Sequence, residues 1–418
     1  MKFLWRVNMR KLPRNSIDYY LLPNKILCSM IGIWPPDEKR SICSKVFAYF
    51  LYTLSLIALF SVFVPGLFLI AVNWGDLKIL TGVGCVSTTL AQLLFKKIYL
   101  VARREKSCGL YKELRSLWES TDDPKERQSY EEFAYWARIC SIIFYSSGTT
   151  TVIIFTISAA CDYIRSEHND NGVNGRHLPF DVWYGTDVTE SPNFEIAFVC
   201  QFLAALLGTA GICAIDTTCV TTILHISGQF RLISRWISNI GIEIRCHSIN
   251  YISDRSGNLA TDLIKCIRHH QRLINLVNDV NDLLTPIIFL QLLTSGIEIC
   301  LSGFAVMSNG SNADLFKFIS YLLSMMIQLL LWCWPGAILV QESQQVGEIA
   351  YLNVPWYKLP LINRKQLLLI ILRSQKYCSI SALTFQTLSI HTLTSVFNTA
   401  TSYFALLRQM QQNEVSML

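Results

Sequence analysis

The chain has 418 residues, of which 51% are hydrophobic and only 16% are charged, and its mean hydropathy is +0.34. About a quarter of the residues of an ordinary soluble domain are charged, so this composition excludes a soluble globular protein. The net charge of +6 follows the placement of basic residues around membrane helices, described below, and we expect no nucleic-acid partner.

The N-terminal segment, residues 1–45, is basic and is interrupted by Pro13, Pro23, Pro35 and Pro36. It has no early apolar core of the kind that forms a signal peptide. We therefore expect it to remain as a cytoplasmic segment, and we expect the first membrane helix to serve as its own insertion signal.

Seven apolar blocks follow, each of the length that spans a bilayer, which is at least about 17 residues. In chain order they are residues 46–73, 77–95, 139–161, 194–224, 283–307, 315–340 and 381–410. The sequence therefore predicts an all-α, seven-transmembrane protein in a lipid bilayer. Residues 46–340 carry its first six helices, and 381–410 form the seventh.

The basic residues set the orientation of these helices. Of the 36 lysines and arginines, 31 lie in four segments: 1–45, 96–138, 224–272 and 341–380. By the positive-inside rule these segments face the cytoplasm. With seven helices, the N-terminus is then cytoplasmic and the tail 411–418 is extracellular, which is the reverse of a G-protein-coupled receptor.

The connections have different expected roles. The outer loop 164–193 is long, and its apolar run Leu178–Tyr184 suggests a lid folded over the bundle. The inner segment 225–282 and residues 361–373, inside the cytoplasmic anchor segment 341–380, have amphipathic patterns. We expect them to be cytoplasmic extensions of the fourth, fifth and seventh helices, packed into a small intracellular domain.

The expected outer surface offers two modification sites. The one glycosylation sequon is Asn309-Gly310-Ser311, in the connection after the fifth helix, which the topology places outside. The 14 cysteines show no paired spacing, and most lie in apolar segments. A disulfide between Cys161 and Cys200 is left open.

Motifs for catalysis are absent: the chain has no GxGxxG, P-loop, HExxH or GxSxG. Adjacent His269 and His270 point about 100° apart on a helix and cannot share a metal. A membrane acyltransferase using His391 as a base is the enzyme alternative, but no acceptor site accompanies it. We expect no enzyme, no cofactor and no metal.

Two acidic residues lie inside expected membrane helices, and such residues are functional candidates by default. They are Asp216 in the fourth helix and Glu298 in the fifth. For Asp216 the simpler interpretation is a hydrogen bond to Thr217, Thr218 or Thr221.

The seventh helix has one apolar and one polar face at helical spacing. The apolar stripe is Leu393, Phe397, Ala400, Phe404 and Leu407. The opposite stripe is Thr392, Ser395, Thr399, Ser402, Leu406 and Gln409. Lipid cannot satisfy the polar face, so it is expected to line a pore or to hydrogen-bond between packed helices. Both alternatives stay open on the stripe alone.

Several runs resemble the insect odorant receptors. They are NVPWYKLP at 353–360, LRSQ at 372–375, SYFALLRQM at 402–410, LPFD at 178–181, and the stretch from Ile215-Asp216 to Gln229-Phe230. Gustatory receptors share the fold but end in Thr-Tyr, five apolar residues and Gln-Phe, whereas this chain has Ser402, Arg408 and Met410. The long cytoplasmic insertion of the odorant-receptor co-receptor is also missing, which indicates a ligand-tuned subunit.

The resemblance implies a subunit of an odorant-gated, non-selective cation channel, a heterotetramer with the co-receptor in the plasma membrane of a sensory neuron dendrite. The seventh helix would line the pore, with Leu406 and Met410 as an apolar gate, Gln409 beside them, and Thr399 and Ser402 deeper along the stripe. The alternatives are a gustatory-type channel of the same fold and, from another class, a G-protein-coupled receptor, which the topology disfavours.

The odorant site is expected among helices two to six, in the outer half of the bundle under the lid. Its candidate residues are Val83, Ser87, Tyr145, Gly148, Val152, Phe155, Gln201, Phe202, Tyr321 and Met325. Plain helix packing is the alternative role for each aromatic. Because no charged residue converges there, we expect a small hydrophobic volatile or waxy ligand. The sequence does not identify it.

Overall fold

The computed structural model describes residues 16–33, 42–121, 123–168, 177–185, 188, 190–246, 256–308, 312–383 and 386–417. Within these residues the chain is mainly helical. The N-terminal and bundle helices are α1 (Ile17–Tyr20), α2 (Leu22–Met30), α3 (Ile42–Val72), α4 (Leu77–Ala102), α5 (Arg104–Glu119), α6 (Pro124–His168) and α7 (Asn193–Cys246). The remaining elements are α9 (Ser256–Ser308), α10 (Asn312–Asn353), η2 (Trp356–Lys358), α11 (Leu361–Ser374), β1 (Ser381–Ala382), β2 (Gln386–Thr387) and α12 (Ile390–Met417).

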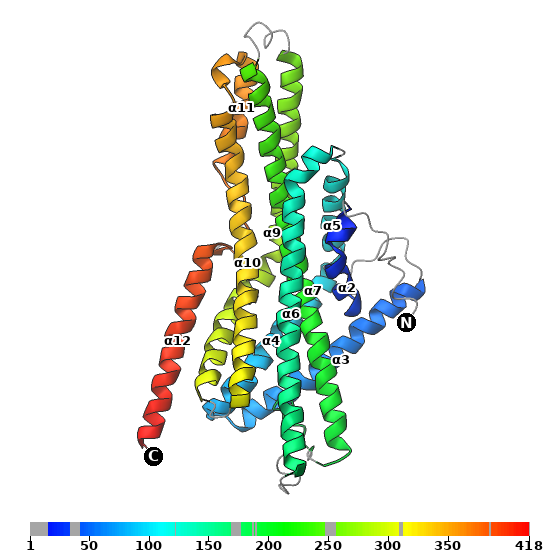
Figure 1. Cartoon of the computed structure of the whole chain (residues 1–418), viewed down its shortest axis with the longest axis vertical. Coiled ribbons are helices and arrows are strands. Elements are labelled where there is room, and N and C mark those ends of the chain that lie inside the picture. Colours follow the sequence, from blue (N-terminus) through cyan, green and yellow to red (C-terminus); the bar gives the residue numbers. More distant parts are fainter. Residues whose placement is uncertain are drawn as a thin grey trace.

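The molecule is an elongated bundle in which α6, α7, α9 and α10 run along the long axis (Figure 1). Helix α7 is the central element and contacts α2, α3, α4, α6, α9 and α10. The turn between α3 and α4, the end of α6 and the start of α7 lie at the lower end of Figure 1, and α11 lies at the upper end. We call these the predicted outer and inner ends.

Six helices among the described residues are long and apolar enough to cross a membrane: α3, α4, α6, α7, α9 and α10. Helix α12 falls outside this set because its polar stripe lowers its hydropathy. The chain is therefore a helical membrane protein. The crossing by its last helix, and the orientation of the bundle, remain predictions.

The predicted inner connections are largely helical among the described residues. Residues 96–138 contain α5 and the first turns of α6, which starts at Pro124, a residue suited to a first helical position. Helices α7, α9 and α10 all extend beyond their apolar blocks, and we call residues 225–246, 256–282, 341–353 and α11 the extension bundle. There Arg231 of α7 bonds Glu342 of α10 at 2.5 Å and Glu132 of α6 at 3.2 Å.

The predicted end of the second helix at Phe95 is wrong. Helix α4 continues to Ala102, and both Lys96 and Lys97 are fully buried in the bundle rather than lying in an inner loop. Lys96 pairs with Asp216, and Lys97 donates to Ser55. A lysine usually marks the end of a membrane helix. It is tolerated inside the bundle when a carboxylate or hydroxyl lies within hydrogen-bonding distance of its ammonium group.

The predicted start of the seventh helix is also wrong. Here β1 and β2 form a two-stranded antiparallel hairpin in which Ser381 pairs with Thr387 and Ala382 with Gln386. Helix α12 begins at Ile390, where the Ser389 side chain accepts the backbone N–H of Thr392. The hairpin separates α11 from α12, so α11 is not an extension of the seventh helix.

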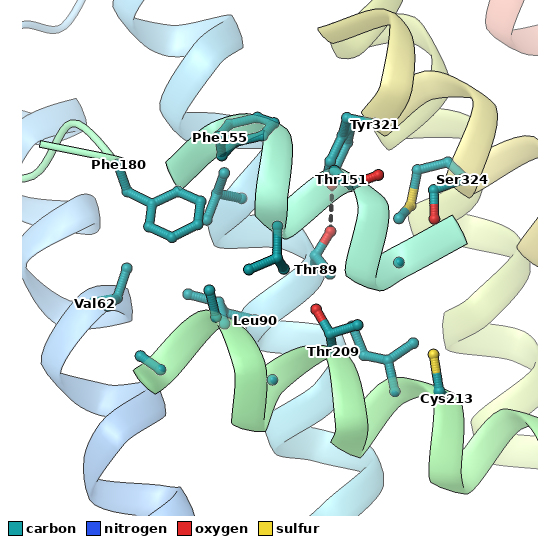
Figure 2. A pocket seen from close by; sticks show the side chains of 18 of the residues that line it. Val62, Thr89, Leu90, Thr151, Phe155, Phe180, Thr209, Cys213, Tyr321 and Ser324 are labelled. Atoms are coloured by element: carbon teal, nitrogen blue, oxygen red, sulfur yellow. Dashed lines mark hydrogen bonds between the residues drawn. The ribbon is translucent and has the colours of Figure 1, made fainter. Parts of the chain in front are cut away.

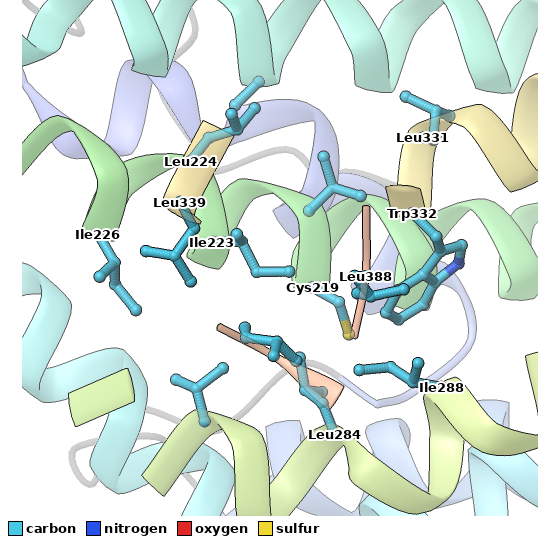
Figure 3. Packing of buried hydrophobic residues seen from close by; sticks show 14 of the residues in the cluster. Cys219, Ile223, Leu224, Ile226, Leu284, Ile288, Leu331, Trp332, Leu339 and Leu388 are labelled. Atoms are coloured by element: carbon cyan, nitrogen blue, oxygen red, sulfur yellow. The ribbon is translucent and has the colours of Figure 1, made fainter. Parts of the chain in front are cut away.

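The hairpin fixes the beginning of α12 to the bundle. Asn281 of α9 accepts the backbone N–H of Ser381 at 2.8 Å, and Leu388 is fully buried. Gly336 of α10 makes room for it, since a Cβ there would lie only 2.7 Å from the Leu388 carbonyl oxygen. Figure 3 shows Leu388 close to Trp332 in the core between α7, α9 and α10.

Beyond the hairpin, α12 stands at the edge of the bundle (Figure 1) and packs on α9. Its apolar stripe faces the bundle: Ala400 is buried, and Leu393, Phe397, Phe404 and Leu407 pack against the core. Gly303 of α9 lies under Phe404, where even a Cβ would come within 3.6 Å of the ring. The later part of the polar stripe, Thr399, Ser402, Leu406 and Gln409, faces away from the subunit. Thr392, at its start, is buried and donates to the Thr387 carbonyl.

Candidate functional site: an apolar cavity and a polar helix face

A cavity of about 110 Å³ lies between α3, α4, α6, α7 and α10 toward the predicted outer end. Figure 2 shows Val62, Leu90, Phe155 and Phe180 on its apolar side, and the hydroxyls of Thr89 and Tyr321 side by side. Its lining is mostly apolar, with a few hydroxyls and one thiol, and it contains no charged side chain. This is the composition of a site for a small apolar molecule with few polar groups.

Five of the ten predicted ligand residues line this cavity: Gly148, Val152, Phe155, Tyr321 and Met325. The other five do not, namely Val83, Ser87, Tyr145, Gln201 and Phe202. Val83 and Ser87 instead lie against Gly66 of α3. Tyr145 packs on the core from a half-buried position, and Phe202 is half-buried on α7.

Sequence reasoning missed a larger part of the lining. On α4 the cavity face is Val86, Thr89 and Leu90, so the predicted face was rotated by part of a turn. On α7 the lining is made by small residues: Ala204, Ala205, Gly208 and Thr209. Their four-residue spacing was the available signal, because small side chains repeated on one helix face leave space beside the helix. The remaining missed residues are Val62, Phe144, Thr151, Phe180, Ile212, Cys213 and Ser324.

The lid residues 177–185 close the cavity from the outer end. Phe180 enters the lining and stacks on Phe155, with ring centroids 5.6 Å apart. Gln201 holds it there, because its side chain accepts the Phe180 N–H at 2.9 Å and donates to the Phe180 carbonyl at 3.1 Å. Gln201 therefore positions the lid instead of lining the cavity. Phe180 and Val182, from the apolar run of the loop, pack against the core of the bundle.

A second anchor holds the lid to α3. The backbone N–H of Trp183 donates to the carbonyl of Pro65 at 3.3 Å, and the Trp183 ring lies 6.1 Å from that of Phe68. Gln201 also donates to Tyr184 at 3.3 Å, and burial raises the pKa of Tyr184, which keeps the phenol protonated. The lid is thus bonded to both α3 and α7.

A ladder of polar side chains joins α4 to α9 beneath the cavity. Its three rungs are Thr89 to Glu298 at 2.8 Å, Gln92 to Thr294 at 2.5 Å and Lys96 to Gln291 at 2.5 Å. The spacing of three and four residues on each helix places every rung on one face. Burying these groups in hydrogen-bonded pairs avoids the cost of leaving them unsatisfied in an apolar environment.

The lowest rung extends to α7 and α10. Lys96 bonds Asp216 at 2.6 Å, and both side chains are almost completely buried. Gln328 of α10 donates to the other Asp216 oxygen, also at 2.6 Å. The simpler interpretation of Asp216, a bond to a neighbouring threonine, is therefore wrong: its partners come from two other helices.

The predicted gate residues all lie on the outward face of α12. Thr399, Ser402, Leu406, Gln409 and Met410 are exposed in the single chain, with Leu406 at 54% and Met410 at 47% of their full accessible area. Arg408 is exposed as well. An unpaired polar face on a helix of membrane length requires a partner other than lipid.

Two predicted surface features have simple outcomes. Asn309 lies outside the described residues. Cys161 and Cys200 are both free thiols, so the disulfide left open by the sequence is not formed. Among the described residues, no group of three or more histidine, cysteine, aspartate or glutamate side chains is arranged to hold a metal ion.

Together, the bundle and cavity define a class: a multi-pass helical membrane protein with a small apolar cavity covered by a loop. The family model described as 7tm Odorant receptor matches residues 78–401. The match covers most of the chain, so this protein belongs to the insect odorant receptor family and is a multi-pass protein of the plasma membrane.

The relatives agree with this assignment. Odorant receptor 22c of Drosophila melanogaster is 25% identical over 405 residues, covering 95% of this chain and 98% of the relative. Odorant receptor 10 of Aedes albopictus is 24% identical over 341 residues, covering 81% and 86%. The solved insect olfactory receptor OR5 from Machilis hrabei, in complex with eugenol, has the same fold: its TM-score is 0.76 at 14% identity, over 94% of this chain and 97% of that chain.

Proposed function

We propose that this chain is the ligand-tuned subunit of an odorant-gated, non-selective cation channel, and that it assembles with the odorant-receptor co-receptor into a heterotetramer. The observation that carries this proposal is the division of α12 into two faces. Its apolar stripe packs on α9, while Thr399, Ser402 and Gln409 face outward. Lipid cannot hydrogen-bond these groups, so neighbouring subunits and a water-filled path are their natural environment.

The gate belongs to the same helix in this proposal. Leu406 and Met410 are one turn apart on the exposed face, so copies of them around an axis form an apolar ring. Such a ring closes a channel by expelling water. Co-receptor subunits would supply the rest of the ring.

The cavity is the odorant site in this proposal. It is apolar, it is covered by Phe180, and it is lined by five of the residues expected from the sequence. The solved olfactory receptor of the same fold carries eugenol, a small aromatic molecule, which supports a ligand of this kind. We propose Gly148, Val152, Phe155, Tyr321 and Met325 as ligand contacts, with Thr89 and Phe180 added.

A physical connection between cavity and gate runs through α9. Glu298 bonds Thr89 at the cavity, and the same helix carries Gly296 and Gly303 beneath Val396 and Phe404 of α12. A shift of α9 caused by ligand binding would therefore move the contacts of α12. Ligand binding then biases the open–closed equilibrium by its differential affinity for the two states.

The test is a current recording from cells that express this chain with the co-receptor, the co-receptor alone, or this chain alone, during application of a broad odour panel. The proposal predicts an odour-evoked cation current in the cells that express both proteins, with an odour ranking that the co-receptor alone does not produce. Odour responses that require G-protein signalling and survive without the co-receptor would contradict it.

A further inference from the structure

The polar end of the cavity has more hydrogen-bond acceptors than protons. Thr89 and Tyr321 both line the cavity, and their hydroxyl oxygens are 2.5 Å apart (Figure 2). Tyr321 donates to the Cys85 carbonyl oxygen at 3.0 Å. Thr89 lies 2.8 Å from a carboxylate oxygen of Glu298 and 3.1 Å from the same Cys85 carbonyl oxygen. Two protons thus serve four contacts, and the carbonyl and the ionised carboxylate can only accept.

Glu298 increases the imbalance. Its side chain is fully buried, and its second oxygen, Oε2, has no hydrogen-bond partner among the described residues. With the Thr89 proton on Glu298 and the Tyr321 proton shared between the Thr89 oxygen and the Cys85 carbonyl, both hydroxyls have lone pairs but no proton for the cavity. Leaving a buried acceptor without a hydrogen-bond donor is unfavourable.

The hydroxyl of Thr151 also has its proton engaged by backbone carbonyls. Thr151 also lines the cavity, and it lies 3.1 Å from the Ser147 carbonyl and 3.2 Å from the Ser320 carbonyl, to which it donates. The wall formed by α4, α6 and α10 therefore presents acceptors to a ligand. A complementary ligand brings a donor.

We propose that the cavity selects small apolar ligands that carry one hydrogen-bond donor, such as alcohols and phenols, over ethers of the same skeleton. Glu298 is the positioning residue for this choice, because it engages the proton of Thr89. The inference rests on the proposed function for the place where odorants bind, and it adds the chemical class that binds there.

The experiment compares matched probes: benzyl alcohol with benzyl methyl ether, and para-cresol with its methyl ether. Half-maximal concentrations are measured from currents in cells that express this chain with the co-receptor. We expect the alcohol and phenol to act at concentrations at least about fivefold lower than their ethers, which follows from the cost of the unsatisfied acceptor. Equal potency within each pair overturns the inference and leaves the proposed function standing.

Three variants test which side chains cause the preference for hydrogen-bond donors. Thr89→Val keeps the shape and removes the acceptor, so the donor-to-ether ratio should fall toward one. Glu298→Gln adds amide protons in the place of an acceptor and should also lower the ratio. Thr209→Val is the matched control: it removes a hydroxyl that lines the same cavity from α7, and among the described residues this hydroxyl makes no hydrogen bond to Glu298. It should keep the wild-type ratio, and a loss of preference there instead of at Thr89 would refute the assignment.

A binding measurement separates this inference from channel activity. The melting temperature of the purified full chain in detergent is measured with each probe. Surface labelling of cells separately checks that every variant reaches the membrane. A larger rise in melting temperature with benzyl alcohol than with its ether supports the donor preference, even where no current is evoked. The absence of current would then contradict the proposed function alone. An equal rise with both probes refutes the preference.

Discussion

Lys96 and Asp216 form a buried ion pair in the bundle, with their charged groups 2.6 Å apart. The surrounding side chains complete their hydrogen bonds: Gln291 accepts from Lys96, and Gln328 donates to Asp216. A buried pair adds little net stability compared with apolar residues, but removing one member leaves the other charge uncompensated. The pair therefore acts as a specific clamp between α4 and α7.

We predict that Lys96→Met destabilises the protein by about 3 kcal/mol or more, measured as a lower apparent melting temperature in detergent. Lys96→Met combined with Asp216→Leu should recover part of the loss, since no buried charge remains. Lys106→Met is the control, because its partner Asp282 is 3.6 Å away and exposed, and it should cost less than about 1 kcal/mol. A double variant no more stable than the single one would argue against the clamp.

His270 makes the extension bundle sensitive to acid. It is 4% exposed and packs edge-on against Phe230. Burial, and then the charge of Arg373, lower the pKa of His270 from 6.5 to about 4. Since the folded protein binds this proton less readily than the unfolded chain, stability is present above the ordinary pKa and declines as the pH falls from 6.5 toward 4.

We predict a loss of about 2 kcal/mol from His270 at about pH 5, seen as a lower melting temperature than at neutral pH. His270→Phe should flatten that part of the pH dependence, because the ring packing stays and the titrating group goes. If the variant and the parent lost stability equally on acidification, His270 would not be the source.

At the scale of elements, α12 shows which features of a helix can be predicted from its sequence pattern. The apolar and polar faces followed from helical spacing, and the structure packs the apolar stripe inward. The start of the helix did not follow, because Ser381–Thr387 forms a hairpin through contacts with Asn281 on a distant helix. The cap at Ser389 was the local signal, three residues before Thr392.

We predict that cysteines placed at Ser395, Thr399, Ser402 and Leu406 react with polar thiol reagents applied from outside, and that the reaction reduces odour-evoked current. A water-filled path along the polar face explains this access. Cysteines at Leu393, Phe397 and Phe404 should be protected by α9. The reverse labelling pattern would mean that the polar face joins helices and lines no pore.

At the scale of the whole molecule, the composition and the apolar blocks were sufficient for a helical membrane protein, and six of the seven blocks are long apolar helices in the structure. The cavity was only partly predictable. Helix periodicity places Gly148, Val152 and Phe155 on one face, but the rotation of α4 depends on its buried lysines and their partners on other helices. One sequence does not show those partners.

We predict that a tag on the C-terminus is accessible to antibody on intact cells, while a tag on the N-terminus is stained only after permeabilisation. The reason is that most of the 36 basic residues lie in segments on the predicted inner side, even with Lys96 and Lys97 set aside because α4 buries them in the bundle. Asn309→Gln should remove any glycosidase-sensitive mass. An N-terminal tag that stains intact cells would reverse the orientation.

The most direct test of the cavity as the odorant site compares two substitutions one residue apart on α6. Val152 lines the cavity and is 7% exposed, whereas Ile153 is 51% exposed and points away from the core. Val152→Phe should fill much of the 110 Å³ space and raise the half-maximal odorant concentration at least about tenfold or abolish the response. Ile153→Phe, at matched surface expression, should stay within about twofold of the parent. Equal concentration–response curves for the two variants would contradict the account.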